Sequence, residues 1–317
     1  MGAAVRWKLG TRGSPLALWQ ARHIAASLEA AAGSRGSADA LALEIVVVKT
    51  IAERFPERPL VEIEGGAFSR ELDDALLGGS IDLAVHSLKD LPTEYPAGLA
   101  IAAVPPRGSP LDAFVGAGAT RLDDLPPGAR IGTGSPRRRA QLLARRPDLE
   151  VVPLRGNVET RLRKIEAEKL AGTILAVAGL RRLGREAAIT ETLAPEVLLP
   201  AVGQGALAVV VRRDDAKTRE LVASLDDAAS HTRVLAERAF LRRLRGGCQA
   251  PAAALATLER DVLRLDALLA SLDGTRLVRS SRRGSVENPE ALGLAVAEEI
   301  LARGGDEILA GLRGDAR

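Results

Sequence analysis

The sequence predicts an α/β protein with a smaller α+β domain at its C-terminal end, and three observations support this. Over the first two thirds of the 317 residues, short apolar runs alternate with stretches of helical periodicity, which is typical of largely parallel sheets. Beyond residue 250 the pattern changes to consecutive strand-like runs. One strand-to-helix motif also occurs twice along the chain. The length allows two or three domains of about 100 to 200 residues each.

Short apolar runs in the first two thirds are predicted to be buried strands. They span residues 5–10, 43–48, 81–86, 99–104, 130–134, 150–154, 173–178 and 206–211. The last third is expected to begin with a helix over residues 231–245. A hairpin with an "LDGT" turn follows, and then a helix that starts at "NPEALGL".

Two stretches that contain Pro and Gly are predicted hinges, "VPPRGSP" at 104–110 and "LLPAVGQGA" at 198–206. Together with a division near residue 225 they separate three domains. The first lobe takes residues 1–105 and 200–223, the second takes residues 106–199, and the α+β domain takes residues 224–317.

The composition excludes several classes of protein. With 46% hydrophobic and 27% charged residues, the chain is neither disordered nor fibrous. No apolar run approaches the roughly 18 to 20 residues that span a bilayer, and the N-terminus lacks the apolar segment of a secretory signal. A single cysteine allows no internal disulfide, which fits a reducing compartment. We therefore expect a cytoplasmic protein without a membrane partner.

Basic charge is concentrated in the middle of the chain. Residues 130–185 carry fourteen Lys or Arg against five Asp or Glu, although the whole chain has a net charge of only +3. The same segment contains no Phe, Trp or Tyr on which bases could stack, which argues against nucleic acid. A site for small anions and a solvated basic face both remain open.

The repeated motif joins a strand to a helix through Gly-Thr and Ser-Pro. Its two copies are "LGTRGSPLALWQA" (9–21) and "IGTGSPRRRAQLLA" (131–144). Ser14 and Ser135 suit the N-cap position, and the prolines that follow them suit the first helical position. A simple local cap is the alternative, but the duplication favours two lobes built in the same way.

Arginines surround the second copy. Three of them follow the cap at once, Arg137, Arg138 and Arg139, although cations at a helix N-terminus are unfavourable by about 0.3–1 kcal/mol each. This indicates an anion-binding function, because helix N-termini and guanidinium groups both bind anions. Arg155, Arg161 and Arg182 follow later strands, so parallel strands would gather them at one edge of a sheet. A solvated arginine-rich surface is the alternative.

The stretch "IDLAVHSLKDLPT" carries the best acid-base candidate of the first lobe. Asp90 follows the strand and could act as a general acid or stabilise a cation. Lys89 could bind an anionic group. A surface ion pair between the two is the alternative. His86 lies at the end of an apolar strand and is expected to be a core histidine rather than a base.

Several other sites are absent from the sequence. There is no G-x-S-x-G turn, no G-x-x-x-x-G-K-[ST] loop and no complete dinucleotide fingerprint. Three widely separated histidines and one cysteine give no zinc spacing, so we expect no metal.

The only cysteine, Cys248, lies in "RLRGGCQAP" behind Gly246 and Gly247. Glycines leave room for a bulky group, and the neighbouring Arg243 and Arg245 favour a thiolate, which is a strong nucleophile. Covalent attachment of a group is one interpretation. A small buried apolar side chain is the other.

Seven stretches together resemble the porphobilinogen deaminase (hydroxymethylbilane synthase) family. They are "GTRGSPLALWQA", "IDLAVHSLKDLP", "GTGSPRRRAQL", "LRGNVETRL", "ILAVAGLRRLG", "LPAVGQGAL" and "GGCQAP". The resemblance implies two α/β lobes like those of periplasmic binding proteins plus an α+β domain that carries Cys248. It also implies head-to-tail joining of four porphobilinogen molecules, with release of ammonia and hydrolysis to hydroxymethylbilane. A dipyrromethane cofactor bound to Cys248 through a thioether would be the primer.

The resemblance assigns roles to residues at matching positions. Asp90 would be the catalytic carboxylate, and Arg139 receives no role. The residues implied to bind the cofactor are Ser87, Lys89, Thr133, Ser135, Arg137, Arg138, Arg155 and Arg161. Those implied to bind the substrate or the growing chain are Arg12, Ser14, Gln20, Arg182 and Gln204.

The sequence departs from the family pattern at three places. "TIAE" (50–53) and "EGGAF" (64–68) replace a usual T-x-G-D and a lysine-containing Gly-rich segment of the lid. Gly134 stands where a hydroxyl residue is frequent. We expect a monomer whose partner is the small molecule porphobilinogen. The alternative from another class is a non-catalytic solute-binding or ligand-sensing module of the same two-lobed fold.

Overall fold

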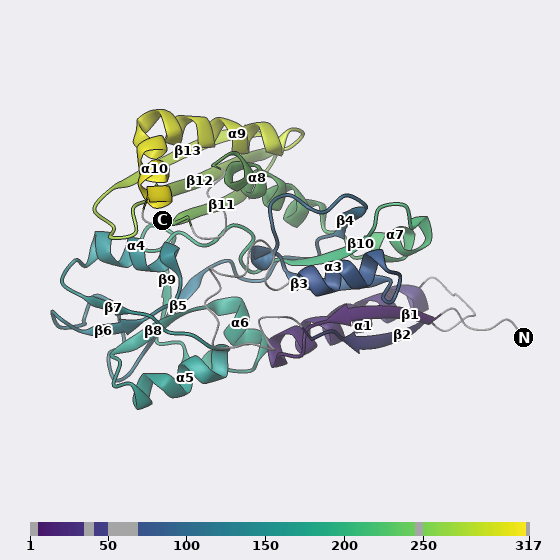
Figure 1. Ribbon diagram of the computed structural model, residues 1–317, viewed down its shortest axis with the longest axis horizontal. Helices are drawn as coiled ribbons and strands as arrows, with labels where there is room; N and C mark the ends of the chain where they lie inside the picture. Colours follow the sequence, from purple (N-terminus) through teal and green to yellow (C-terminus); the bar gives the residue numbers. More distant parts are fainter. Residues whose placement is uncertain (1–5, 35–40, 50–68, 245–249, 315–317) are drawn as a thin grey trace, which may run out of the picture. The chain divides into compact units, whose positions relative to one another are not determined.

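The computed structural model describes residues 6–34, 41–49, 69–244 and 250–314 (Figure 1). Contacts within the chain define two compact units. The first contains Met1–Arg107 and Ala206–His231, and the second contains Gly108–Gly205 and Thr232–Arg317. The three-domain division predicted from the hinges stays a prediction.

The first unit is built on a five-stranded sheet of order β2-β1-β3-β10-β4. β1 runs parallel to β2 and β3, whereas β10 runs antiparallel to β3 and β4. The strands are β1 (Arg6–Thr11), β2 (Ala42–Val47), β3 (Leu83–Ser87), β4 (Leu99–Ala103) and β10 (Leu207–Arg212). The helices are α1 (Pro15–Ser34), α3 (Arg70–Leu77) and α7 (Ala216–Ala223), with a 3₁₀ turn at Leu88–Asp90.

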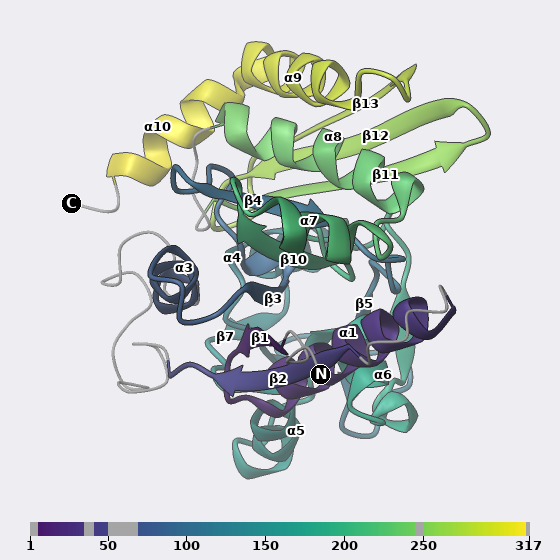
Figure 2. The same cartoon turned by 90° about the vertical axis from the view of Figure 1, so that its right-hand side faces the viewer.

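Helices cover both faces of this sheet. Leu9 packs with Ile24 of α1 and Val222 of α7 in one buried cluster. Gly10, the next residue of β1, lies against Leu72 of α3, whose side chain would be 3.1 Å from a Cβ at that position. Because neighbouring residues of a strand point to opposite faces, α1 and α3 lie on opposite sides of the sheet (Figure 2).

The second unit contains a sheet of the same design, in the order β7-β6-β8-β5-β9. Its strands are β5 (Asp112–Gly116), β6 (Arg130–Gly132), β7 (Glu150–Val152), β8 (Gly172–Ala176) and β9 (Glu191–Leu193). Its helices are α4 (Pro136–Arg145), α5 (Val158–Ala167) and α6 (Val177–Arg182), with a 3₁₀ turn at Glu186–Ala188. Leu142 of α4 packs with Phe114 in one cluster, and Ile165 of α5 packs with Val115 in another, so α4 and α5 cover opposite faces.

Both sheets are mixed, but four of the five strands in each sheet run in the same direction, so the expectation of largely parallel strands is confirmed. In each sheet the fourth strand is antiparallel to both of its neighbours. That strand is β5 or β10, and each comes just after the chain has passed from one unit to the other. It therefore enters the sheet from the opposite end to the strands that precede it. β5 and β9 are also strands that the apolar pattern did not predict.

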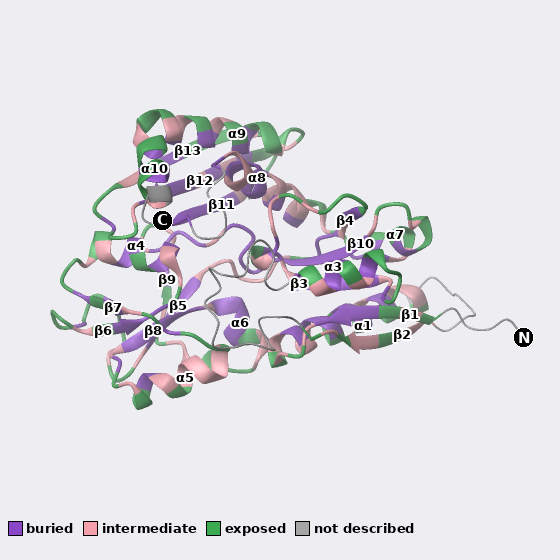
Figure 3. Ribbon diagram, viewed as in Figure 1, coloured by how far each residue is buried: buried purple, intermediate pink, exposed green. Residues whose placement is uncertain are grey.

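The C-terminal part of the second unit is an antiparallel sheet of β11 (Ala252–Glu259), β12 (Val262–Ala270) and β13 (Leu277–Ser285). Its helices are α8 (Ala228–Leu244), which belongs to this unit from Thr232 onward, α9 (Pro289–Ile300) and α10 (Asp306–Gly314). Phe240, Val296 and Ile308 of these helices share one buried cluster with the sheet. Figure 3 shows buried segments in purple along β11 and β12. The other face packs on Ala140 and Leu199. Two α/β lobes and a smaller α+β domain are thus confirmed.

One glycine of this domain makes a close approach possible. Gly274, in the "LDGT" turn, has φ +75°, and a Cβ there would meet the Ala140 carbonyl oxygen of α4 at 2.4 Å. A side chain would be excluded both by the backbone angle and by the helix.

None of the helices in the described ranges is long and apolar enough to cross a membrane.

Two buried titratable groups of the first unit respond to pH in opposite ways. Burial raises the pKa of Asp73 in α3 to about 6. Burial, together with the charge of Arg12, lowers the pKa of His86 in β3 to about 4. Between about pH 4 and 6 the folded chain holds a proton on Asp73 that the unfolded chain lacks. The unfolded chain holds a proton on His86 that the folded chain lacks, so the two contributions nearly cancel.

Single substitutions at Asp73 and His86 should reveal the pH dependence of the unfolding free energy that cancels in the parent. Relative to the parent, the unfolding free energy of Asp73→Asn should rise by about 2–3 kcal/mol from pH 4 to pH 6, because only the histidine contribution remains. That of His86→Gln should fall by a similar amount over the same range. Urea unfolding at several pH values measures both, and parallel pH profiles for the parent and the two variants would contradict the prediction.

Candidate functional site

In the first unit, the predicted site residues follow the carboxyl ends of two neighbouring parallel strands. Arg12 and Ser14 come directly after β1, while Lys89 and Asp90 follow β3. Because the two strands are parallel, both groups lie at the same edge of the sheet, where open α/β sheets bind ligands. The structure therefore brings these residues of the first unit together.

Hydrogen bonds fix the loop after β1. The Ser14 Oγ accepts from the Ala17 amide at 3.3 Å, which confirms the predicted cap of α1. One turn into the helix, the buried Gln20 donates from Nε2 to the Ser87 Oγ at 2.7 Å. This contact joins the start of α1 to the end of β3. Gln20 thus orients a hydroxyl predicted to bind the cofactor, and its own predicted contact with substrate remains a prediction.

Asp90 is carried by a short turn whose neighbours are anchored in the core. Leu88 and Leu91 are buried, and the Leu88 amide donates to the Ala206 carbonyl at 3.1 Å. Asp90 itself is half-buried and Lys89 is exposed. The carboxylate is therefore presented from a fixed backbone at the edge of the sheet. His86, two residues before the turn, is buried as predicted for a core histidine.

In the second unit, the loop after β6 is closed by two hydroxyl groups. The Ser135 Oγ accepts from the Arg138 amide at 3.4 Å and confirms the predicted cap of α4. The buried Thr133 accepts through Oγ1 from the Ser135 amide at 3.2 Å. A Cβ on Gly134 would lie 3.0 Å from the Leu154 carbonyl oxygen, so the departure at this position leaves the loop close to that strand end.

Arg137 and Arg138 are buried around a carboxylate, which contradicts the alternative of a solvated surface for these two arginines. Asp112, the first residue of β5, is 0% exposed and accepts through Oδ1 from Arg138 Nη2 at 2.7 Å and Nε at 3.1 Å. Its Oδ2 lies 2.9 Å from Arg137 Nη2. Arg138 also donates to the Ile174 carbonyl, and Arg137 to the Leu199 carbonyl. Their role in binding a cofactor remains a prediction.

Asp112 is the residue that sequence reasoning missed. A lone acid at the start of a short strand carries no recognisable spacing, and only its pairing with residues 25 and 26 positions later identifies it. Burial would raise the pKa of Asp112, but the charges of Arg137 and Arg138 outweigh burial and lower the pKa to about 2. The carboxylate is therefore ionised at neutral pH.

Gln204 and Arg182 hold the connecting segments of the second unit. The buried Gln204 donates from Nε2 to the Pro110 carbonyl at 2.7 Å and to Asp112 Oδ1 at 3.0 Å. Arg182 donates to the Gly205 carbonyl at 2.7 Å, and burial lowers the pKa of its guanidinium to about 10. Gly205 has φ +87°, and a Cβ there would meet the Gly108 carbonyl oxygen at 2.5 Å. Contact of Gln204 or Arg182 with substrate remains a prediction.

Arg155 and Arg161 follow β7 at the same edge of the sheet. Asn157 caps α5 by accepting from the Thr160 amide at 2.9 Å. Arg155, just before the cap, is exposed, and Arg161, in the first turns of α5, is half-buried. β6, β7 and β8 are parallel, so their carboxyl ends bring the arginines of the second unit to one edge.

This edge fits a group that carries carboxylates. Arg137 and Arg138 share one carboxylate, and burial outweighs that carboxylate in lowering the pKa of Arg137. A buried positive charge that is only partly balanced favours a further anion. Among the described residues, no three His, Cys, Asp or Glu side chains are grouped so as to hold a metal ion.

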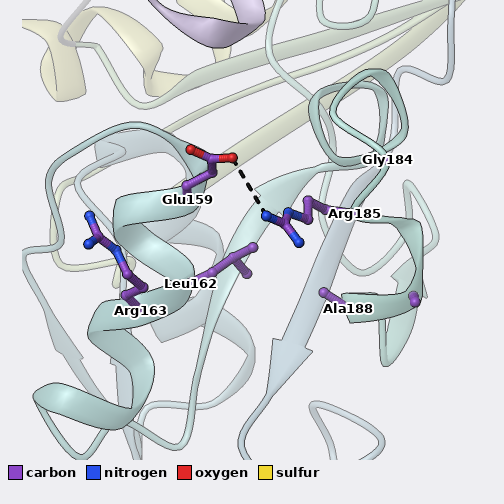
Figure 4. Close-up of a pocket in the computed structure, with 7 residues that line it drawn as sticks. Glu159, Leu162, Arg163, Gly184, Arg185 and Ala188 are labelled. Carbon is purple, nitrogen blue, oxygen red and sulfur yellow. Dashed lines mark ion pairs between the residues drawn. The ribbon is translucent and has the colours of Figure 1, made fainter.

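A separate hollow of about 820 Å³ lies between α5 and the 3₁₀ turn at Glu186–Ala188 (Figure 4). Glu159 and Arg185 face one another across it at 3.7 Å, and both side chains are about half exposed. The predicted site residues are not among those that line this hollow. It is therefore distinct from the arginine-rich edge.

Comparison with known proteins supplies the family. A model of the porphobilinogen deaminase dipyromethane cofactor binding domain matches residues 7–220, and one of the porphobilinogen deaminase C-terminal domain matches residues 231–302. The chain belongs to the porphobilinogen deaminase family. The first model covers the strands of both five-stranded sheets, and the second covers most of the α+β domain described above.

Curated relatives named porphobilinogen deaminase match nearly the whole chain. That of Pelotomaculum thermopropionicum is 48% identical over 310 residues, 98% of this chain and 97% of the relative. That of Rubrobacter xylanophilus is 49% identical over 313 residues, 98% and 99% of the two chains. Among solved structures, an ABC transporter periplasmic substrate-binding protein from Coxiella burnetii has a TM-score of 0.42 and 15% identity, over 71% of this chain and 94% of that one. Because the family consists of enzymes, the alternative of a non-catalytic solute-binding or ligand-sensing module is not favoured.

Two predicted features of the family lie outside the described residues. One is Cys248 with its glycines, within 245–249, and the other is the departing segment within 50–68. Arg243, which was expected to favour a thiolate, is described and forms an ion pair with Glu298 at 2.6 Å. Its charge is therefore partly balanced by α9, which weakens that expectation.

Removing one guanidinium from the buried cluster should destabilise the protein strongly. Arg138→Met leaves the buried Asp112 with one arginine, and we expect a loss of about 3–5 kcal/mol in unfolding free energy. Arg139→Met is the matched control. The exposed Arg139 donates one hydrogen bond to the Val151 carbonyl at 2.6 Å, so its replacement should lower the unfolding free energy by about 1 kcal/mol or less. Both are measured by urea unfolding in a Cys248→Ser background, and equal losses would contradict the prediction.

Proposed function

We propose that this chain joins four porphobilinogen molecules head to tail on a covalently held dipyrromethane primer. Ammonia leaves at each addition, and hydrolysis releases the linear tetrapyrrole hydroxymethylbilane. The observation that carries the proposal is the match of two porphobilinogen deaminase models in sequence along residues 7–220 and 231–302. We further propose that the enzyme works as a monomer in the cytoplasm, with neither a nucleic acid nor a membrane as partner.

Asp90 is the proposed catalytic carboxylate. Loss of ammonia from porphobilinogen leaves a cationic pyrrole, and a fixed negative charge beside it lowers the free energy of the step that forms it. The position of Asp90 supports this role, since its half-buried side chain extends from an anchored turn at the end of β3. Arg12, Ser14 and Gln20 at the same edge are proposed to bind the substrate.

Basic and hydroxyl side chains are proposed to bind the cofactor's carboxylates. Each pyrrole carries an acetate and a propionate, so a growing chain accumulates negative charge. Guanidinium groups bind carboxylates through two parallel hydrogen bonds. The proposed cofactor-binding set is Ser87, Lys89, Thr133, Ser135, Arg137, Arg138, Arg155 and Arg161, and Arg182 and Gln204 are proposed for the growing chain. When bound, the cofactor supplies the pyrrole to which the first substrate molecule is joined.

Cys248 is the proposed attachment atom for the cofactor. Intact mass of the purified protein, or of cofactor-free protein after addition of porphobilinogen, should show a covalent adduct in the parent. Cys248→Ser should show none, because a hydroxyl is a far weaker carbon nucleophile than a thiolate. Asp74→Asn, at an exposed acid of α3 outside the proposed site, is the control that keeps the thiol. A pyrrole-loaded Cys248→Ser protein would refute the attachment, and an adduct-free parent would refute the function.

Turnover should depend on the charge of Asp90. We expect Asp90→Asn to lower kcat by about 100-fold or more, because removing one group that stabilises transition-state charge costs roughly 10²–10³ in rate. The control is Asp74→Asn, an exposed acid of α3 in the same unit. Steady-state rates of pyrrole consumption measure both, and a normal kcat for Asp90→Asn would overturn the assignment.

A further inference from the structure

One carboxylate oxygen of Asp112 is held by hydrogen bonds, and the other makes an ion-pair contact without a hydrogen bond. Oδ1 accepts hydrogen bonds from Arg138 Nε and Nη2 and from Gln204 Nε2, at 3.1, 2.7 and 3.0 Å. Oδ2 faces Arg137 Nη2 at 2.9 Å. Rotation of the carboxylate would break contacts to three side chains, so the two guanidinium groups are kept in one arrangement.

The surroundings of Asp112 are closed. The side chain of Asp112 is 0% exposed, and those of Arg137 and Arg138 are 6% and 5% exposed. Two guanidinium groups this close repel one another in a poorly solvated interior, and the carboxylate between them offsets that repulsion. With one negative charge for two positive charges, the cluster keeps a net charge of +1 for a further anion.

The remaining contacts of the two arginines hold them to the backbone. Arg138 Nη1 donates to the Ile174 carbonyl of β8 at 2.8 Å, and Arg137 Nη1 donates to the Leu199 carbonyl at 2.7 Å. A guanidinium has five N–H bonds. These contacts therefore fix the orientation of each group while using only part of its donors.

We propose that Asp112 is a positioning residue that pre-arranges Arg137 and Arg138 and sets the charge of the pair so that it takes one carboxylate of the bound pyrrole chain. This inference rests on the proposed function, since it names what prepares those two arginines for the cofactor. Asp112 acts through the arginines and is not a catalytic residue. Gln204 supports it by fixing Oδ1 and the Pro110 carbonyl at once.

The test follows loading of cofactor-free protein with porphobilinogen by intact mass over time. We expect Asp112→Asn, which keeps the shape but removes the charge, to load about 10- to 100-fold more slowly than the parent, by analogy with residues that orient the ligands of a metal ion. Asp112→Glu keeps the charge and moves it by one methylene, so it should load more slowly than the parent but faster than Asp112→Asn.

Asp123→Asn is the matched control. Asp123 forms an ion pair at 2.8 Å with Arg145, which lies on α4 like Arg137 and Arg138. Both side chains of this pair are more than 40% exposed. The same chemical change there should leave loading within about twofold of the parent, since exposed ion pairs contribute about 0–1 kcal/mol.

A second measurement separates positioning from simple stabilisation. The Tm of the loaded protein is compared with that of its unloaded Cys248→Ser counterpart, in the parent and in each variant. A purely structural Asp112 would lower both Tm values equally, whereas a positioning residue reduces the difference between them. Where Asp112→Asn does not fold, Asp112→Glu is judged by the same two measurements.

The possible results decide between the alternatives. Slow loading together with a reduced Tm difference supports the proposal. Loading within about twofold of the parent, or equal lowering of both Tm values, overturns it. If the parent itself acquires no adduct, the proposed function fails, and that outcome is distinct from normal loading of an Asp112 variant.

Discussion

The second unit depends on one buried carboxylate. Asp112 joins the start of β5, the first turn of α4 and the segment around Gln204, three elements far apart in the sequence. Replacing such a cluster by apolar side chains can leave stability unchanged, so a buried ion cluster is weak evidence for a purely structural role. Its position at the beginning of α4, beside the predicted cofactor-binding loop, gives it a reason to be polar.

The two five-stranded sheets are built in the same way. Each places parallel strands side by side, ends one of them in a Ser-Pro cap, and inserts a strand from the next passage of the chain in the antiparallel direction. The polar groups of each unit consequently gather at one edge. In the first unit these groups present the carboxylate of Asp90, and in the second they present mainly guanidinium groups. Arg12 and Lys89 lie at the same edge as Asp90, so the first unit combines a carboxylate with cations, whereas the second presents mainly cations.

Much of this could be predicted from local sequence. The strand runs, the caps at Ser14, Ser135 and Asn157, and the gathering of site residues at strand ends follow from periodicity and hydrogen bonding near in the chain. β9 was missed because only one of its three residues, Leu193, is apolar. β5 was missed because its apolar run is only three residues long, between Asp112 and Gly116. The charge of Asp112 is neutralised only by residues brought near in the fold. Local patterns contain no information about such partners.

A second buried carboxylate shows that Asp112 is one case of a more general device. Glu237 of α8 is 0% exposed and accepts from the Gly203 amide at 2.7 Å and the Ala256 amide at 2.9 Å. The segment that contains Gly203 and Gln204 is thus held on one side by Glu237 and on the other through Asp112. Both contacts are made by side chains, and neither is a backbone hydrogen bond of a helix or a sheet. A connecting segment lacks a regular ladder for its backbone amides, and buried carboxylates satisfy amide and guanidinium donors that would otherwise destabilise the interior.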